Sequence, residues 1–402
     1  MSRTILVNAG PWLPVPPSGY GGIENVLATL IPELRGLGVR VVLCATADST
    51  LEVDRLVASF DRGQFGQIAE PYNRTMGIAH AHMATVLEFL RAEGEPIDLV
   101  HDHLEVVGPA VLGAMGRAAP PVLQTLHWDL RKHPDFYGSF DGRGRVRFCG
   151  VSDRQVELAP ARLRDQTLGA VPLAVDVARF PFEESKNGPF LVLGRMAAIK
   201  GPDVAARACR RAGHALDLAG PVAGVGDPDA LEAALADPGD PVHGHDDATY
   251  FEAAVRPHLG GDVRWIGSVE GERKLELLSR ARALVTPIRW EEPGATAVVE
   301  ALACGTPVIG MRRGALPALV DHGVTGFLAD HDDELPGYLA RAAEIEPAAC
   351  RAAAESRFTS RAFAEAYLER YEAVIAGAPW PAPPGSRGVH APPAPAAAPA
   401  PR

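Results

Sequence analysis

Short runs of consecutive apolar residues alternate along the chain with longer segments whose apolar residues recur every three or four positions. The first strand candidate is 4–9; after a Gly/Pro-rich loop, the apolar residues of 23–37 follow helical spacing, and the next strand candidate is 39–45. Short, continuously apolar runs separated by amphipathic helices are typical of parallel sheets covered on both faces. The pattern therefore predicts an α/β fold.

The alternation continues and then starts again near residue 189. Further strands are expected at 97–101, 122–126 and 148–151, and after the restart at 190–194, 216–219, 263–266, 283–286 and 308–309. We predict two doubly wound, Rossmann-like domains, residues 1–180 and 181–355, that face each other across a cleft. A helix within 356–376 is expected to cross back to the N-terminal domain, and the Ala/Pro/Gly-rich tail 377–402 is expected to be disordered.

Composition and charge exclude several classes of protein. A net charge of −11 over 402 residues argues against a nucleic-acid binder. No apolar run approaches the length of a membrane span, and the N-terminus does not resemble a signal peptide. The five cysteines contain no CxxC pair, which favours buried, reduced thiols. We expect a soluble, cytoplasmic protein without stable membrane insertion.

Loops that follow strands are where ligands of doubly wound sheets bind. The first such loop contains Gly21 and Gly22, whose amides could approach a phosphate or sugar closely, ahead of a helix N-terminus. Glu24 stands where a GxGxxG motif would need its third glycine, which disfavours a dinucleotide site of that kind. A merely structural tight turn is the alternative interpretation.

Two cations lie in the loop after the strand expected at 190–194. Arg195 offers a bidentate fork and Lys200 a mobile point charge, and both could reach a diphosphate from this loop. The alternative interpretation is that both residues are solvated surface cations. Their position after the end of a strand makes this interpretation less attractive.

Two carboxylates follow the strand expected at 283–286. Glu292 falls in the loop and Glu300 in the next helix, and we expect both to face the same cleft. The amides of 294–296 would form the helix N-terminus, another seat for phosphate. The alternative interpretation is that one glutamate marks the start of a helix and the other is a surface charge, which is common for such pairs. Glu300, however, lies in an apolar stretch and needs a partner there.

Histidines permit two interpretations. His101 and His103 flank Asp102, but neighbouring strand residues point to opposite faces, so we expect no metal site. His127 follows the strand expected at 122–126 and is a candidate for the cleft, with a purely structural role as the alternative.

Together these segments resemble the family 4 retaining glycosyltransferases of the GT-B fold. The most specific stretch is 292–309, which is similar to the family's E-x7-E motif and the EA.ACGTPVI that follows it. Residues 194–201 resemble its GR….KG phosphate site, and 20–24 its N-terminal glycine loop in members acting on small molecules and antibiotics. The resemblance runs over most of residues 4–375.

The resemblance implies transfer of a sugar from a nucleotide diphosphate sugar, a UDP-sugar or GDP-sugar, to the hydroxyl of a small-molecule or glycan acceptor. Transfer would occur with retention, by same-face attack in which the departing phosphate takes the acceptor proton. No metal ion, no cofactor and no dedicated base is then needed. Domain closure would limit hydrolysis of the donor by excluding water.

The same resemblance assigns roles to single residues. Arg195 and Lys200 would hold the diphosphate and stabilise its charge as it leaves, and Glu292 would contact hydroxyls of the donor sugar. The other donor-binding candidates are Glu300 at the ribose, Val269 beside the base, and the amides of Gly294, Ala295 and Thr296. Gly21, Gly22 and His127 would line the cleft from the N-terminal side. The catalytic candidates are thus Arg195, Lys200, Glu292 and His127.

Two positions depart from the family's pattern. The family usually has Phe-Gly after Glu-Pro or Glu-Ser, where this chain has Gly294-Ala295, so the donor geometry is expected to differ slightly. An Asn-Gly before Val175-Asp176 is replaced by Leu173-Ala174, near the hinge. The two cations and both glutamates are intact, which favours an active enzyme.

Three rival functions stay open from the sequence. A nucleotide-sugar epimerase on the same architecture would convert the donor without any acceptor. A non-catalytic nucleotide-sugar-binding protein would bind the donor and turn over nothing. A glycosidase is a weaker rival, because it would need two facing carboxylates about 5 Å or 6.5–9.5 Å apart and would have no use for Arg195 and Lys200.

Overall fold

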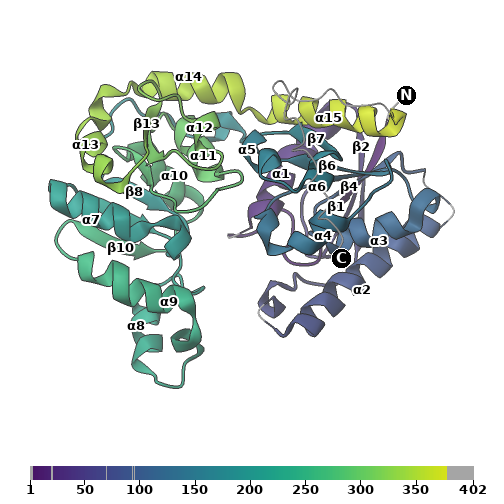
Figure 1. Cartoon of the computed structure of the whole chain (residues 1–402), viewed down its shortest axis with the longest axis horizontal. Coiled ribbons are helices and arrows are strands. Elements are labelled where there is room, and N and C mark those ends of the chain that lie inside the picture. Colours follow the sequence, from purple (N-terminus) through teal and green to yellow (C-terminus); the bar gives the residue numbers. More distant parts are fainter. Residues whose placement is uncertain (1–2, 20, 69, 93, 95, 378–402) are drawn as a thin grey trace, which may run out of the picture.

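The computed structural model describes residues 3–19, 21–68, 70–92, 94 and 96–377 (Figure 1). Residues 378–402, which make up nearly all of the tail expected to be disordered, lie outside the described residues. So does Tyr20, in the loop before the first helix.

The N-terminal domain is built on a parallel sheet of seven strands in the order β3-β2-β1-β4-β5-β6-β7. The strands are β1 (Thr4–Asn8), β2 (Arg40–Ala45), β3 (Arg55–Ala58), β4 (Leu99–Asp102), β5 (Val122–Thr125), β6 (Val146–Gly150) and β7 (Thr167–Ala170). From β1 the chain adds strands first on one side of the sheet, as β2 and β3, and then on the other side, from β4 onward. The switch point, where ligands of such sheets bind, therefore lies at the carboxyl ends of β1 and β4.

Helices cover both faces of this sheet and bury two separate apolar clusters against it. The helices are α1 (Gly22–Gly36), α2 (Tyr72–Arg91), α3 (Val107–Met115), α4 (Pro134–Ser139), α5 (Asp153–Glu157) and α6 (Ala161–Arg164). In α1 the apolar residues at helical spacing, such as Leu27 and Leu30, are completely buried.

The C-terminal domain has the same architecture and is built on a parallel sheet of six strands in the order β10-β9-β8-β11-β12-β13. The strands are β8 (Phe190–Leu193), β9 (Leu216–Ala219), β10 (Val263–Gly267), β11 (Leu284–Thr286), β12 (Val308–Met311) and β13 (Gly326–Ala329). Its helices are α7 (Pro202–Ala212), α8 (Pro228–Ala236), α9 (Asp246–Tyr250), α10 (Gly271–Arg280), α11 (Thr296–Ala303), α12 (Leu316–Leu319), α13 (Leu335–Ala340) and α14 (Pro347–Arg357). One large apolar cluster holds these elements together.

The chain crosses between the domains twice, and the two crossings lie side by side. Val175 pairs with Thr359 in a parallel bridge, and its amide and carbonyl bond the backbone at Phe358 and Ser360. The last helix, α15 (Ser360–Ala376), then packs against α1 of the N-terminal domain (Figure 1). Two adjacent strand-like segments therefore form the connection on which the domains could move relative to each other.

The predicted α/β class with two Rossmann-like domains is confirmed. The elements that the sequence pattern did not reveal include edge strand β3, whose residues are mostly exposed, and helix α2, which has no long apolar stripe. All five cysteines are buried and unpaired. Within the described part of the chain, no helix combines the length and the apolar character needed to cross a membrane.

Candidate active site

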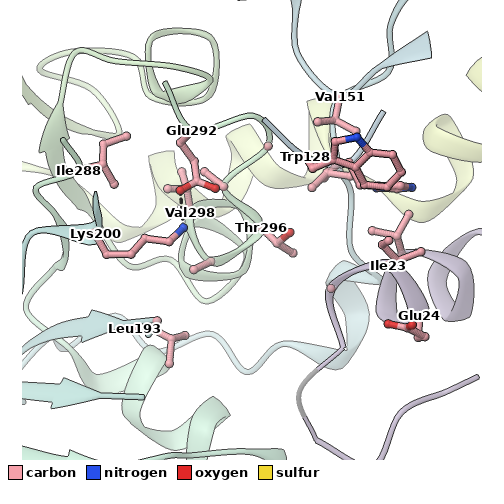
Figure 2. A pocket seen from close by; sticks show the side chains of 18 of the residues that line it. Ile23, Glu24, Trp128, Val151, Leu193, Lys200, Ile288, Glu292, Thr296 and Val298 are labelled. Carbon is pink, nitrogen blue, oxygen red and sulfur yellow. Dashed lines mark hydrogen bonds and ion pairs between the residues drawn. The ribbon is translucent and has the colours of Figure 1, made fainter. Parts of the chain in front are cut away.

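A pocket of about 530 Å³ lies between the two domains, at the carboxyl ends of strands from both sheets (Figure 2). Its N-terminal wall comes from the residues after β1, β4 and β5 and from the start of α1. Its C-terminal wall comes from the ends of β8 and β11 and from the segment leading into α11. Both Rossmann-like domains thus present their ligand-binding edges to one space.

The C-terminal wall carries an ion pair between Lys200 and Glu292 (Figure 2). Trp290 donates from Nε1 to the same Glu292 oxygen at 3.0 Å, and its ring lies 5.2 Å from the Lys200 ammonium. Gly201 follows with φ +68°, and a Cβ there would lie 2.2 Å from the Pro287 carbonyl oxygen. Only glycine permits this approach, which sets the loop of Lys200 against the loop that leads to Glu292.

The N-terminus of α11 borders the pocket beside this ion pair, since Gly294, Ala295 and Thr296 all line it. Ala295 is the N-cap and has the left-handed conformation, φ 53° and ψ 54°. A Cβ at Gly294 would lie 2.6 Å from Leu173 of the N-terminal domain. Glycine at 294 therefore lets the domains meet closely, and the N-terminus of α11 provides positive potential at the pocket.

Arg195, Glu300 and Val269 do not line this pocket, contrary to the expectation that the two charged residues would share one cleft with Lys200 and Glu292. Arg195 pairs with Asp247 of α9 at 3.2 Å. Glu300 pairs with Lys274 of α10 at 2.7 Å because it lies on the side of α11 that faces α10. A loop residue and a residue in the second helical turn need not share the direction of Glu292, and sequence spacing alone did not reveal that difference.

The N-terminal wall includes Gly22 and the buried carboxyl group of Glu24, in the first turn of α1 (Figure 2). Among the described residues, nothing lies within 4 Å of the position that a Cβ at Gly22 would take, so this glycine leaves open space on their side. Gly21 does not line the pocket, and a Cβ there would collide with Pro17. Burial raises the pKa of Glu24 to about 7, so near neutral pH this carboxyl group is only partly ionised.

His127 lines the pocket, and a hydrogen bond of 2.7 Å joins its Nε2 to Nδ1 of His103. Burial lowers the pKa of both rings, that of His127 to about 3, so both are neutral. His103 Nε2 is buried and has no hydrogen-bond partner among the described residues. If Nε2 carries no proton, it is an unpaired acceptor, which costs less free energy in a buried position than an unpaired N–H would. His103 therefore donates from Nδ1, which leaves His127 protonated on its own Nδ1.

The loop that carries His127 and Trp128 is fixed by Gln155 of α5. Its amide donates to the carbonyl oxygens of Leu126 and Trp128 at 3.1 and 2.9 Å, and its Oε1 accepts from the amide of Val151 at 2.9 Å. One side chain thereby holds the ends of β5 and β6 together beneath the pocket.

Asp102 belongs to a buried polar network and does not itself line the pocket. Asn8 donates to Asp102 at 2.6 Å and accepts from His82 at 2.6 Å, and burial raises the pKa of Asp102 to about 8. His101 bonds Thr125 and Tyr371 of α15 at 2.8 and 2.7 Å. Among the residues that the structure describes, no group of three His, Cys, Asp or Glu side chains could hold a metal ion.

Sequence reasoning did not select Glu24 or His103 as pocket residues, nor Trp12, Phe65 and Ile68, which also line it. For these residues, the only local signal in the sequence was Glu24 itself, an acidic residue in the first turn of an otherwise apolar helix face. The aromatic residues come from loops with no periodicity or motif, and the fold alone brings them together.

Two family models match the two halves of the chain. Residues 177–357 match the model described as Glycosyl transferases group 1, and residues 20–156 match Glycosyltransferase Family 4. The D-inositol 3-phosphate glycosyltransferase of Acidothermus cellulolyticus is similar in sequence, with 27% identity over 392 residues that cover 82% of this chain and 83% of that protein.

Solved structures show the same architecture. AviGT4, a glycosyltransferase involved in avilamycin A biosynthesis, has a TM-score of 0.61 and 26% sequence identity, covering 94% of this chain and all of that one. Anabaena Alr3699/HepE, solved in complex with UDP-glucose, has a TM-score of 0.59 and 17% identity, covering 92% of this chain and 99% of that one. These likenesses extend over both domains.

Proposed function

This chain belongs to the family 4, group 1 glycosyltransferases and has their two-domain GT-B fold, and from that premise we propose the reaction that its pocket performs. The donor is a nucleotide diphosphate sugar, a UDP-sugar or GDP-sugar. The sugar passes to an acceptor hydroxyl with retention of the anomeric configuration, without a metal ion.

The observation that carries this proposal is the Lys200–Glu292 ion pair beside the N-terminus of α11. A diphosphate sugar would separate the pair, with its phosphate oxygens on Lys200 and its sugar hydroxyls on Glu292. Lys200 and the N-terminus of α11 supply positive charge where the leaving diphosphate gains negative charge. In this arrangement, protein groups stabilise the negative charge of the departing phosphate, a role that a divalent cation has in other enzymes.

The remaining donor-binding candidates lie outside the pocket, on the C-terminal domain. Arg195 is 46% exposed and held by a single ion pair, so it is free to exchange Asp247 for the diphosphate. Glu300 would accept from ribose hydroxyls near Lys274, and Val269 would contact the base. In this placement the nucleoside extends from the pocket along α10 and α11.

The proton of the acceptor needs a destination, and the described pocket offers no histidine that titrates near neutral pH. His127 is neutral with a pKa of about 3, which suits a hydrogen-bond donor to the transferred sugar and not a base. We therefore assign the proton to the departing phosphate. The bond from C1 to the phosphate oxygen breaks, the bond from C1 to the acceptor oxygen forms on the same face, and the phosphate oxygen takes the proton.

Thermal-shift screening of the wild type against a panel of UDP-sugars and GDP-sugars tests the donor, followed by assays of nucleoside diphosphate release with and without acceptors. We expect one donor to raise the melting temperature and release to depend on an acceptor. A new sugar isomer formed from the donor alone would identify an epimerase. Binding without turnover against a broad acceptor panel would identify a sensor.

A further inference from the structure

We infer that the acceptor is an amphiphilic molecule, with a hydroxyl or amino group on an apolar, ring-containing body and no phosphate group. The inference rests on the proposed function and concerns the N-terminal wall of the same pocket. It follows from three features of that wall: its apolar side chains, its buried carboxyl group and its shortage of cations.

Apolar side chains form the outer part of the N-terminal wall. Trp12 and Leu13 follow β1, and Phe65 and Ile68 lie in and just after the short 3-10 turn Phe65–Gln67. Phe65 is 37% exposed and Ile68 is 46% exposed. Large apolar side chains gathered at the mouth of a pocket are typical of a surface that an apolar ligand covers. Trp12 adds a wide, rigid face against which a ring can pack.

Glu24 provides a polar anchor deeper in the pocket. It is only 5% exposed, and its carboxyl group has a hydrogen bond to the backbone amide of Glu24 itself. Burial of a carboxyl group is costly, and a ligand hydroxyl or ammonium that donates to it offsets part of that cost. Because Gly22 next to it leaves open space, a donor group of the acceptor can reach the carboxyl group.

The charges of this wall do not suit a phosphate group. Its described lining contains one cation, Lys132, against two carboxylates, Glu24 and Glu105. Phosphate sites usually combine arginine or lysine side chains with a free helix N-terminus. Here the first turn of α1 already carries the carboxyl group of Glu24, which would repel a phosphate whenever it is ionised.

A matched pair of probes tests this inference by calorimetric titration of the enzyme saturated with nucleoside diphosphate. Phenyl β-D-glucoside and glucose 6-phosphate share the sugar and differ in carrying an aromatic ring or a phosphate. We expect the glucoside to bind at least ~10-fold more tightly, on the basis of the apolar contact that its ring makes. Equal or tighter binding of the phosphate overturns the inference, and so does failure of both probes to bind.

Two variants separate the anchor from the apolar wall. Glu24→Gln should weaken binding of the glucoside about 10-fold, because a charge-assisted hydrogen bond is lost. Ile68→Ser, at an exposed position where folding is not at risk, should weaken it about 3-fold. Glu88→Gln, an exposed carboxylate of α2 outside the pocket, is the matched control and should change nothing. If Glu24→Gln and Ile68→Ser both bind as the wild type does, the inference is wrong.

Failure of the inference and failure of the proposed function give different results. If nucleoside diphosphate does not bind the wild type at all, the proposed donor site is wrong. If nucleoside diphosphate binds and the glucoside does not, only the acceptor class is wrong.

Discussion

The two walls of the interdomain pocket are built from different kinds of side chain. The C-terminal wall has a charged pair, Lys200 and Glu292, beside a helix N-terminus, and these groups come from two short segments of sequence. The N-terminal wall has apolar side chains and buried groups such as Glu24 and His103, which come from the start of α1 and from loops scattered over the domain. In the proposed reaction, the C-terminal wall would stabilise the charge of the leaving group, and the N-terminal wall would recognise the acceptor.

Removal of the positive charge from the C-terminal wall should have the largest effect on catalysis. Lys200→Ala should lower kcat about 10³-fold, because the leaving diphosphate loses a direct cation. The measurement is nucleoside diphosphate release at saturating donor and acceptor. Arg211→Ala, an exposed cation of α7 away from the pocket, is the control and should keep the wild-type rate. A loss of less than ~3-fold in Lys200→Ala would contradict the proposed role.

Replacement of the carboxylate partner should have the next largest effect. Glu292→Gln keeps the size of the side chain but weakens the hydrogen bonds to donor-sugar hydroxyls, and we expect kcat/KM for the donor to fall about 10²-fold. Glu291→Gln is the comparison, since Glu291 pairs with Arg154 of the N-terminal domain and accepts from the Gly314 amide. Similar losses in the two variants would mean that Glu292 acts through the loop structure and not through the donor.

The neutral histidine pair of the N-terminal wall should have a smaller effect on catalysis. His103→Phe removes the hydrogen bond that fixes the tautomer of His127, and we expect kcat to fall about 10-fold with little change in KM for the donor. His103→Gln retains a side-chain donor and should recover part of the loss. A wild-type kcat for His103→Phe would show that His127 does not depend on this bond.

The dependence of stability on pH should also differ between the two domains, because the two buried carboxyl groups whose pKa is raised, Glu24 and Asp102, belong to the N-terminal domain. The folded-state pKa of Asp102, about 8, lies above its ordinary value of 3.8, so the wild type should lose stability as pH rises from ~4 to ~8. Each unit of pKa difference corresponds to about 1.4 kcal/mol. Asp102→Asn should remove this part of the slope.

Urea unfolding of the wild type and Asp102→Asn at pH 5 and pH 8 measures that difference. We expect the stability of the wild type relative to the variant to be greater at pH 5 than at pH 8. The opposite order would mean that Asp102 is ionised in the folded protein. Glu24, whose pKa is also raised, acts in the same direction and should add to the slope of both proteins below pH ~7.

The smallest effect concerns the strained residue of the C-terminal wall. Ala295 has a positive φ, which costs a residue with a Cβ about 1–2 kcal/mol, whereas glycine loses about 0.4–1 kcal/mol through its more flexible unfolded state. Ala295→Gly should therefore raise the unfolding free energy by up to ~1 kcal/mol, measurable by urea denaturation. A destabilised variant would indicate that the methyl group of Ala295 packs well enough to offset the strain.

The sequence predicted the two-domain α/β fold because buried parallel strands are continuous apolar runs, as in Phe190–Leu193. It predicted the segments of the C-terminal wall because Lys200 and Glu292 lie in loops directly after strands. It could not predict the direction of Arg195 or Glu300, since these depend on the nearest opposite charges, Asp247 and Lys274.

The N-terminal wall was harder to predict for a different physical reason. Trp12, Phe65 and Ile68 have no shared periodicity, and only the order of the strands brings their loops to one edge of the sheet. The buried state of Glu24 was also hidden, since a glutamate in a first helical turn is ordinarily a solvated charge that complements the helix dipole. The strain at Ala295 became visible only once its backbone angles were known.

The division between the two walls is tested most directly by calorimetric titration of the preferred nucleoside diphosphate into the wild type, Lys200→Ala and Glu24→Gln. We expect equal dissociation constants for the wild type and Glu24→Gln, and a dissociation constant at least ~10-fold higher for Lys200→Ala. Equal binding by Lys200→Ala and the wild type, or an equal loss in Glu24→Gln and Lys200→Ala, would contradict it.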